Sequence, residues 1–470
     1  MSECRFHKLS PDKAYVTNNL ILPRKFIAEA PVKRALELAY GEVDVMDEMG
    51  NHIGTRPNIL RLWDENEHHL IAPREFIPQK DWHRFKFEFI NLSPKSFPKI
   101  KVEDSIHLRD LDQEAAFDTM LKYPSGTLNL SCGKGKTIIA LKMVAWLRVP
   151  TIVVVNSTAL LEQWKDEIRT HLKVADVGVV QGNTAQWEGK AIVVAMVHTL
   201  AGKREGWCRK FRRRFGLIIY DEGHHMSAPV FVKSADLFYG RRYSLTATAE
   251  RLDGLERVYQ YHLGPVIHTN LSQQLIPKTV FHRLKWEMPI RDKNEVTDVS
   301  GEINLSKVRI YLGTLYWRNH IIYKDLIHDL MEGRTILVLT HSIKHVSTLH
   351  DYFSASGSGM ITGDVIQGNR LAVLRECNPV FGTFQLAREG LNKPSLDTLY
   401  VLTPFASRND RQQAWGRIQR EHEGKKDPLV RVYEDTAFTC SIRSCQGLRR
   451  DLRKHGYPVE MRTVHVEGIG

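Results

Sequence analysis

Short apolar runs recur along the chain from about residue 127 onward, and longer amphipathic segments separate them. Apolar runs of this length, bounded by helical patterns, predict buried strands of parallel sheets with helices on both faces. The pattern therefore predicts an α/β fold with two parallel-sheet domains in tandem. The expected strands of the first series are 127–130, 151–155, 191–195 and 217–220, and those of the second series are 335–339, 359–361 and 399–402.

The N-terminal part of the chain carries strand-like pieces but no chemical motif, so we expect a small α+β domain there. The segment 20–27 reappears as 70–77 with six of eight positions identical, and both copies contain a Pro-Arg pair. One interpretation is a paired nucleic-acid-facing loop, and the other is two strand ends of one small sheet, which we favour. The segment Leu-Arg-Leu-Trp over 60–63, followed by the polar residues 64–66, predicts a hairpin turn.

The change of pattern sets the expected domain boundaries. We predict an N-terminal accessory domain over residues 1–105, a first α/β domain over 106–285 and a second α/β domain over 286–470. The second series of strands begins after the polar stretch 291–304.

Composition narrows the class of protein. With 470 residues, 42% of them apolar and 26% charged, the chain can bury real cores, which excludes wholesale disorder. Its apolar runs are far shorter than the about 18 residues that span a bilayer, and no segment near Met1 resembles a secretory signal. We therefore expect no membrane partner and a cytoplasmic location. The six scattered cysteines predict neither a disulfide framework nor a zinc site, and the net charge of +12 favours a polyanionic partner.

The segment Leu-Ser-Cys-Gly-Lys-Gly-Lys-Thr, which ends at Thr137, lies between an expected strand and an expected helix. This is the context that a phosphate-binding loop requires. Gly133 and Gly135 would let backbone N–H groups turn toward phosphate oxygens, and the helix N-terminus adds a favourable dipole. Lys136 would reach the β- and γ-phosphates, and the Thr137 hydroxyl would hold Mg²⁺.

Two carboxylates, Asp221 and Glu222, follow the buried run 217–220. The C-terminal end of a parallel strand lies at the ligand edge of such a sheet. Asp221 would hold Mg²⁺, directly or through water, and Glu222 would orient and deprotonate the attacking water. A solvated strand cap is the alternative, but a phosphate loop about 85 residues upstream makes the catalytic interpretation the stronger one.

The ordered set of motifs resembles the superfamily-two helicases over residues 106–460. Besides the phosphate loop (motif I) and the Asp-Glu pair (motif II), the chain is similar to this family at its adenine-reading glutamine and at motifs Ia, Ib, III, V and VI. Motif VI reads Gln-Ala-Trp-Gly-Arg-Ile-Gln-Arg over 413–420. The chain departs from the family pattern at Leu130, in the spacing before Gln113, at Gly223 and at Asn392.

The resemblance implies two RecA-like domains, ATP and Mg²⁺ as cofactors, and a role for each matching residue. The catalytic set is Lys136, Glu222, Gln413, Arg417 and Arg420. The ATP-binding set is Gln113, Gly133, Gly135, Lys136 and Thr137, with Thr137 and Asp221 on the metal. The coupling set is His224, Thr246, Thr248, Gly390 and Asn392, and the nucleic-acid-binding set is Ser157, Gln163, His198, Thr199, Arg251 and Thr383. The two arginines would neutralise charge on the γ-phosphate when the domains close, so that ATP binding shifts an open–closed equilibrium.

Two features favour the DNA-directed branch that resembles XPB and the UvsW-like phage helicases. Segment 161–164 reads Leu-Glu-Gln-Trp, unlike motif Ia of the RNA-directed DEAD-box enzymes, and segment 251–253 resembles the Arg-Glu-Asp element of XPB. We therefore expect an ATP-dependent DNA helicase or branch-migrating translocase of phage replication or recombination. Its partner would be single-stranded, forked or junction DNA in the host cytoplasm, with residues 1–105 recognising DNA structure. The alternatives are an RNA helicase or remodeller and a non-catalytic nucleic-acid-binding module with a degenerate ATP site.

The segment 203–214 contains seven basic residues and one acidic residue, a net charge of +6. One interpretation is a contact with a phosphate backbone. The other is a solvated helix with Trp207 and Phe211 packed beneath it, and we favour this second interpretation. A second basic helix, 443–454, is open to the same two interpretations.

Overall fold

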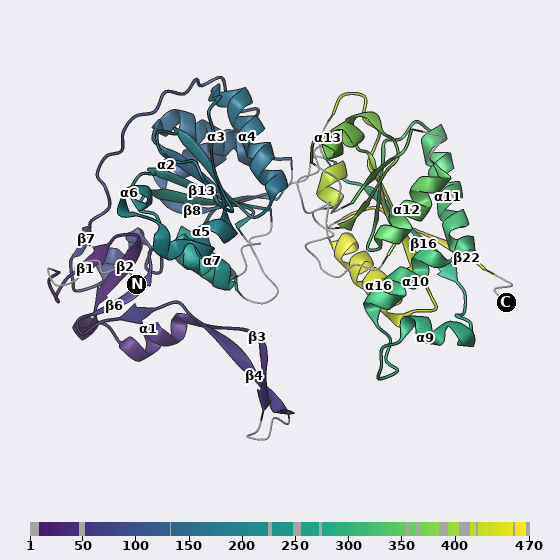
Figure 1. Ribbon diagram of the computed structural model, residues 1–470, viewed down its shortest axis with the longest axis horizontal. Coiled ribbons are helices and arrows are strands. Elements are labelled where there is room, and N and C mark those ends of the chain that lie inside the picture. The colour runs from purple at the N-terminus through teal and green to yellow at the C-terminus, as the bar shows by residue number, and fades with distance from the viewer. Residues whose placement is uncertain are drawn as a thin grey trace. The chain divides into compact units, whose positions relative to one another are not determined.

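Figure 1 shows the computed structural model of the chain. Contacts divide it into two units, residues 1–271 and 272–470, and each unit contains a parallel sheet. The predicted α/β fold with tandem RecA-like domains is confirmed. The described residues are 9–46, 52–131, 133–223, 228–247, 255–271, 275–353, 357–362, 367–384, 393–403, 414–419, 422–454 and 456–466.

The sheet of the first α/β domain has eight strands in the order β11-β10-β12-β9-β13-β14-β8-β15. All neighbouring strands are parallel except the pair β10 and β11. The strands are β8 (Ser125–Leu130), β9 (Thr151–Val155), β10 (Gly178–Gln181), β11 (Thr184–Ala185), β12 (Ile192–Met196), β13 (Leu217–Asp221), β14 (Arg241–Thr246) and β15 (Val266–Asn270). Each predicted strand of the first series is present, with ends that differ by no more than two residues.

Helices cover both faces of this sheet because its inner strands are apolar on both sides. In β9, Val153 and Val155 belong to one core, and Ile152 and Val154 belong to the other. The helices on the first core are α2 (Leu111–Lys122), α3 (Lys136–Leu147) and α4 (Thr158–Leu172). Those on the second core are α5 (Val197–Gly202), α6 (Arg209–Arg212), α7 (Ala228–Ala235) and α8 (Glu256–Leu263).

The N-terminal domain is a five-stranded sheet in the order β5-β6-β2-β1-β7, from which a long hairpin extends (Figure 1). The two copies of the repeated segment form β2 (Asn19–Pro23) and β6 (His69–Pro73), which pair antiparallel with Ile21 opposite Ile71. The interpretation of the repeat as neighbouring strand ends of one sheet is therefore confirmed. The remaining elements are β1 (Ala14–Val16), α1 (Glu29–Ala35), the hairpin strands β3 (Glu37–Met46) and β4 (His52–Arg61), β5 (Asp64–Glu65) and β7 (Phe89–Asn91).

The arginines of the two Pro-Arg pairs make intramolecular contacts. Arg24 donates to both carboxylate oxygens of Glu29, at 2.8 and 3.0 Å. Arg74 donates to the backbone carbonyl of Tyr239 in the first α/β domain, and its burial lowers its pKa to about 9. Because both arginines bind groups of the protein itself, the structure does not support the interpretation of the repeat as a nucleic-acid-facing loop.

The N-terminal sheet and the first α/β domain share a single apolar core. One continuous cluster joins Leu20, Leu22 and Leu70 of the small sheet to residues of β9, α5 and α8. The backbone N–H of Glu75 donates to the carbonyl of Tyr261 at 2.8 Å, and the ring of Phe76 lies edge-on to that of Tyr261. The two parts predicted as separate domains therefore form one compact unit.

The second unit has a fully parallel seven-stranded sheet in the order β18-β19-β17-β20-β21-β16-β22. Its strands are β16 (Lys278–Lys285), β17 (Ile336–Thr340), β18 (Gly359–Ile361), β19 (Val380–Thr383), β20 (Thr398–Val401), β21 (Leu429–Asp435) and β22 (Val459–His465). Its helices include α9 (Lys293–Val296), α10 (Leu305–Thr314), α11 (Tyr316–Met331), α12 (Ile343–Tyr352), α13 (Gln367–Glu376) and α16 (Thr439–Lys454).

The border between the units lies earlier than the predicted boundary after residue 285. Strand β16, which we had expected in the first α/β domain, pairs with β21 and β22 of the second sheet. Each helix in the described ranges is too short or too polar to cross a lipid bilayer.

Candidate functional site

Five parallel strands of the first sheet end at the same edge, and predicted site residues follow each of them. The phosphate loop follows β8, Asp221 ends β13, and Thr246 ends β14. Ser157 and His198 follow the ends of β9 and β12, further along the same edge. The fold therefore groups the predicted ATP residues on one half of the edge and the predicted nucleic-acid residues on the other half.

The phosphate loop has the backbone conformation that anion binding requires. Gly133 and Gly135 have positive φ angles of 84° and 76°, and α3 begins directly afterwards at Lys136. Successive N–H groups in such a turn form a concave anion site at a helix N-terminus. Leu130, which departs from the family pattern, is the last residue of β8, with its side chain in the core and its carbonyl accepting a bond from Lys136 Nζ at 3.3 Å.

Gln113, the predicted adenine reader, lies directly against the phosphate loop. Its side chain is buried, and its Nε2 donates to the carbonyl of Lys134 at 3.2 Å. Its Oε1 accepts from the backbone N–H of Arg109 at 2.9 Å, so both ends of the amide are held. A Cβ on Gly135 would fall 2.3 Å from Gln113 Nε2, so this contact requires glycine. Despite the altered spacing before Gln113, its side chain therefore contacts the phosphate loop.

The two acidic residues at the end of β13 meet the lysine of the loop. Lys136 Nζ lies 3.8 Å from Glu222 Oε1. Glu222 has a positive φ of 47°, an uncommon conformation for a residue with a side chain and one that is found at functional sites. The backbone N–H of Glu222 donates to Asp221 Oδ1 at 3.0 Å.

Asp221 is a buried carboxylate held by N–H donors. Burial, and then the charge of Glu222, raise its pKa, and the Trp164 N–H, the Lys136 ammonium and the Glu222 N–H oppose that shift. Trp164 Nε1 donates to Asp221 Oδ2 at 2.8 Å. Trp164 belongs to the segment that resembles motif Ia, but its position in the sequence indicates no role at the site, because a tryptophan on an apolar helix face is ordinarily a core residue.

The donor set at this edge fits Mg²⁺. The ion prefers hard oxygen ligands, and Asp221 and the Thr137 hydroxyl are such donors. Among the described contacts of the Asp221 carboxylate, the hydrogen bonds come from N–H groups. Each of its oxygens therefore keeps a lone pair, and a cation would offset the cost of burying the charge.

Two of the residues predicted to contact nucleic acid have a structural role. The Ser157 hydroxyl caps α4 by accepting from the Leu160 N–H at 3.3 Å, and the Thr199 hydroxyl accepts from the Gly182 N–H at 2.9 Å. His198 is exposed at the same edge. In the second unit Thr383 is the last residue of β19.

Some of the remaining predicted site residues lie outside the described part of the chain. Arg417 lies inside it, in the second unit. The predicted residues for which no placement is described are His224, Thr248, Arg251, Gly390, Asn392, Gln413 and Arg420.

The basic segment 203–214 is built largely on internal contacts. The Trp207 and Phe211 rings stack at 4.3 Å, and Phe211 is fully buried. Arg204 forms an ion pair with Asp236, and Arg214 donates to the carbonyl of Lys190 at 2.6 Å. These contacts favour the packing interpretation. The second basic helix, α16, is similar at Arg449, which forms an ion pair with buried Glu434.

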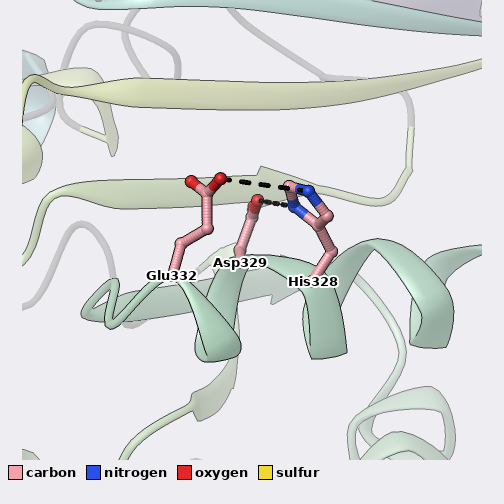
Figure 2. Close-up of side chains that lie close together, drawn as sticks. All are labelled: His328, Asp329 and Glu332. Atoms are coloured by element: carbon pink, nitrogen blue, oxygen red, sulfur yellow. Dashed lines mark hydrogen bonds and ion pairs between the residues drawn. The ribbon is translucent and has the colours of Figure 1, made fainter.

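Figure 2 shows a His-Asp-Glu cluster at the C-terminal end of α11 that has the composition of a metal site: His328, Asp329 and the capping residue Glu332. Asp329 is buried and accepts from Arg431 on both oxygens, at 2.7 and 2.6 Å, and from Tyr400 at 2.6 Å. Although burial opposes it, these bonds hold the pKa of Asp329 below its usual range. A cation here would meet the guanidinium charge, so the cluster is better explained as the partner of a buried arginine.

Comparison with known proteins gives consistent matches. The family "Type III restriction enzyme, res subunit" matches residues 105–251, a span that contains the phosphate loop and the Asp-Glu pair. The chain is 34% identical over 185 residues to DNA 3'-5' translocase XPB2 of Sulfurisphaera tokodaii. The aligned region covers 39% of this chain and 40% of that protein. It is 26% identical over 317 residues to L396 of Acanthamoeba polyphaga mimivirus, provisionally named an ATP-dependent RNA helicase, covering 65% of this chain and 59% of L396.

A solved structure shows the same fold. S. cerevisiae Dbp5 bound to RNA and ADP BeF3 aligns with 76% of this chain and 90% of its own, at a TM-score of 0.53 and 14% identity. The chain spans less than two thirds of the length of L396 and XPB2. The ordered motifs, the loop geometry and these matches agree in their likeness to the superfamily-two helicases, with XPB-like proteins among the relatives.

Proposed function

We propose that the protein hydrolyses ATP and uses the cycle to translocate along DNA, unwinding duplex or moving forked and junction DNA. The observation that carries this proposal is the meeting of Lys136 and Glu222, 3.8 Å apart, beside the buried carboxylate of Asp221. A phosphate loop joined to a base and a metal carboxylate is the arrangement that nucleotide hydrolysis needs.

The residues of the site divide the chemistry between them. The N–H groups of the loop and Lys136 hold the β- and γ-phosphates. Asp221 and Thr137 hold Mg²⁺, which when bound supplies charge neutralisation for the phosphates. Glu222 orients the attacking water and accepts its proton, and the lysine keeps that carboxylate near the phosphate. Arg417 and Arg420, from the second α/β domain, complete hydrolysis by stabilising charge on the γ-phosphate.

DNA is the substrate that we propose first. The XPB-type relatives, which are named DNA translocases or helicases, support it with the higher identities. An RNA helicase is the second candidate, because L396 and its African swine fever virus counterparts are named for RNA and match longer stretches of the chain. Roles in phage replication or recombination, and recognition of DNA structure by residues 1–105, are parts of the first proposal.

The test is steady-state ATP hydrolysis without polymer and with single-stranded DNA, duplex, a four-way junction or RNA. Lys136→Ala serves as the control for the site. We expect strong stimulation by DNA, little by RNA, and no hydrolysis by the variant. Stimulation mainly by RNA would replace the first candidate with the second. Binding of polymer without hydrolysis under every condition would instead indicate a degenerate ATP site.

A further inference from the structure

The indole of Trp164 connects two parts of the first domain that serve different purposes. Trp164 lies on α4, whose N-terminal cap is Ser157, one of the residues proposed to contact nucleic acid. The side chain is almost fully buried against the core of the domain. Its one polar atom, Nε1, donates to Asp221 Oδ2 at 2.8 Å.

This bond determines how the carboxylate is held. Asp221 Oδ1 accepts from the backbone N–H of Glu222, which the chain supplies locally. Oδ2 accepts from Trp164, which is 57 residues away in sequence. With both oxygens anchored, rotation of the carboxylate about its side-chain bonds is restricted. Groups that hydrogen-bond a metal-binding carboxylate orient it, and their loss typically weakens metal affinity by about 10- to 100-fold.

We propose that Trp164 is the positioning residue of the Mg²⁺ carboxylate, and that it ties the orientation of Asp221 to helix α4. The inference rests on the proposed function, because it takes Asp221 as the Mg²⁺ ligand.

The test uses Trp164→Phe, which keeps an aromatic ring in the core and removes the N–H donor. Trp286→Phe is the matched control, because Trp286 is also buried and its Nε1 donates to the buried carboxylate of Asp435, at 3.3 Å, in the second unit. Each variant loses one indole–carboxylate bond, so Trp286→Phe shows the effect of that loss at a distance from the proposed metal site. Thermal unfolding without Mg²⁺ records that cost separately.

The readout is equilibrium binding of a fluorescent ATP analogue as a function of Mg²⁺ concentration. We expect Trp164→Phe to raise the half-saturating Mg²⁺ concentration by about 10-fold or more, with nucleotide binding in EDTA unchanged. Trp286→Phe is expected to leave the half-saturating concentration unchanged. In an Asp221→Asn background, Trp164→Phe should add no further effect on Mg²⁺ dependence, since it acts through that carboxylate.

A half-saturating Mg²⁺ concentration within twofold of the unaltered protein in Trp164→Phe would overturn the role of Trp164. An equal increase in Trp286→Phe would also overturn it, because the effect would then be a general loss of stability. Failure of the unaltered protein to bind nucleotide in a Mg²⁺-dependent way would contradict the proposed function itself, and this inference with it.

Discussion

Gly223 lies directly against Ser244, so that a Cβ built on Gly223 would fall 2.3 Å from Ser244 Oγ and 3.3 Å from its Cβ. Ser244 is fully buried in β14, beside the strand that carries Asp221. The glycine that departs from the family's usual alanine in motif II is therefore matched to the serine of motif III. The two motifs are in contact at this point, and a larger residue at position 223 requires a change at Ser244.

Gly223→Ala is expected to destabilise the first unit by about 1–3 kcal/mol, because the new methyl group must displace Ser244. ATP hydrolysis should fall as well, since the displacement moves the end of β13. Thermal unfolding and steady-state hydrolysis check both effects. Adding Ser244→Ala removes the closest clash and should recover most of the lost stability, and a double variant no better than Gly223→Ala would show that the contact is not the cause.

Glu222→Gln should reduce ATP hydrolysis by about 100-fold or more, because the amide cannot accept a proton from the attacking water. Nucleotide binding should be retained, since Lys136 and the loop glycines remain. The measurements are single-turnover hydrolysis and fluorescent-nucleotide binding. Hydrolysis near the unaltered rate would mean that another group is the base.

Gln113→Ala should weaken ATP binding by about 10-fold and bring the rates with ATP and GTP closer together, because the amide that would read the base is lost. Competition between the two nucleotides measures the selectivity. Gln113 also bonds to the loop through the Lys134 carbonyl, so unfolding temperature is the control for a structural effect. An unchanged ATP preference with intact stability would remove Gln113 from base recognition.

Asp329→Asn is expected to destabilise the second unit by about 3–5 kcal/mol, because it leaves Arg431 buried with less opposing charge. His328→Ala, which alters an exposed member of the same cluster, should have little effect. Denaturant unfolding of both variants, with and without added Zn²⁺, makes the comparison. Stabilisation by Zn²⁺ that is lost in His328→Ala would instead reveal a metal site.

Stability of the second unit should fall on acidification below about pH 6.5. Burial, and then the charge of Arg318, lower the pKa of His345 to about 3, so the folded state keeps this ring neutral while the unfolded state takes up a proton. The contribution is fully present above pH 6.5 and decreases as the pH falls toward 3, with a loss of about 2 kcal/mol at pH 5.

The change that tests this pH dependence is His345→Gln, with exposed His320→Gln as its control. Hydrogen exchange of the β17 amides between pH 5 and 8, corrected for intrinsic rates, reports the opening free energy of that sheet. His345→Gln should flatten its pH dependence, whereas His320→Gln should leave it unchanged. An equally steep profile in both variants would assign the pH dependence to other groups.

Seven of the fifteen described strands in the two parallel sheets could be predicted, because these seven are short, largely apolar runs between amphipathic helices. Strand β9, for example, was predicted with its observed ends. The boundary near residue 285 could not be located, because β16 mixes polar and apolar residues without a regular period and pairs with strands more than 140 residues later in the chain. Pairing over such a distance leaves no local signal.

The candidate site likewise has a part that could be predicted from the sequence and a part that could not. The phosphate loop and the Asp-Glu pair could be predicted because their chemistry depends on residue types at fixed spacing. Two contacts could not be predicted, namely the bond from Trp164 to Asp221 and the insertion of Arg74 into the first α/β domain. Tryptophan on a helix usually indicates core and arginine usually indicates surface, so only the tertiary structure distinguishes these two.

The apolar core shared by the small N-terminal sheet and the first α/β domain has a consequence for movement. Separating the two parts would divide this continuous cluster and expose apolar side chains to water, at a cost of roughly 2 kcal/mol for each large side chain exposed. Residues 1–271 should therefore melt in one transition and not as two. If the proposed function holds, nucleic acid held by the small sheet would keep a constant position relative to the phosphate loop, and any displacement along it would have to arise in other parts of the chain.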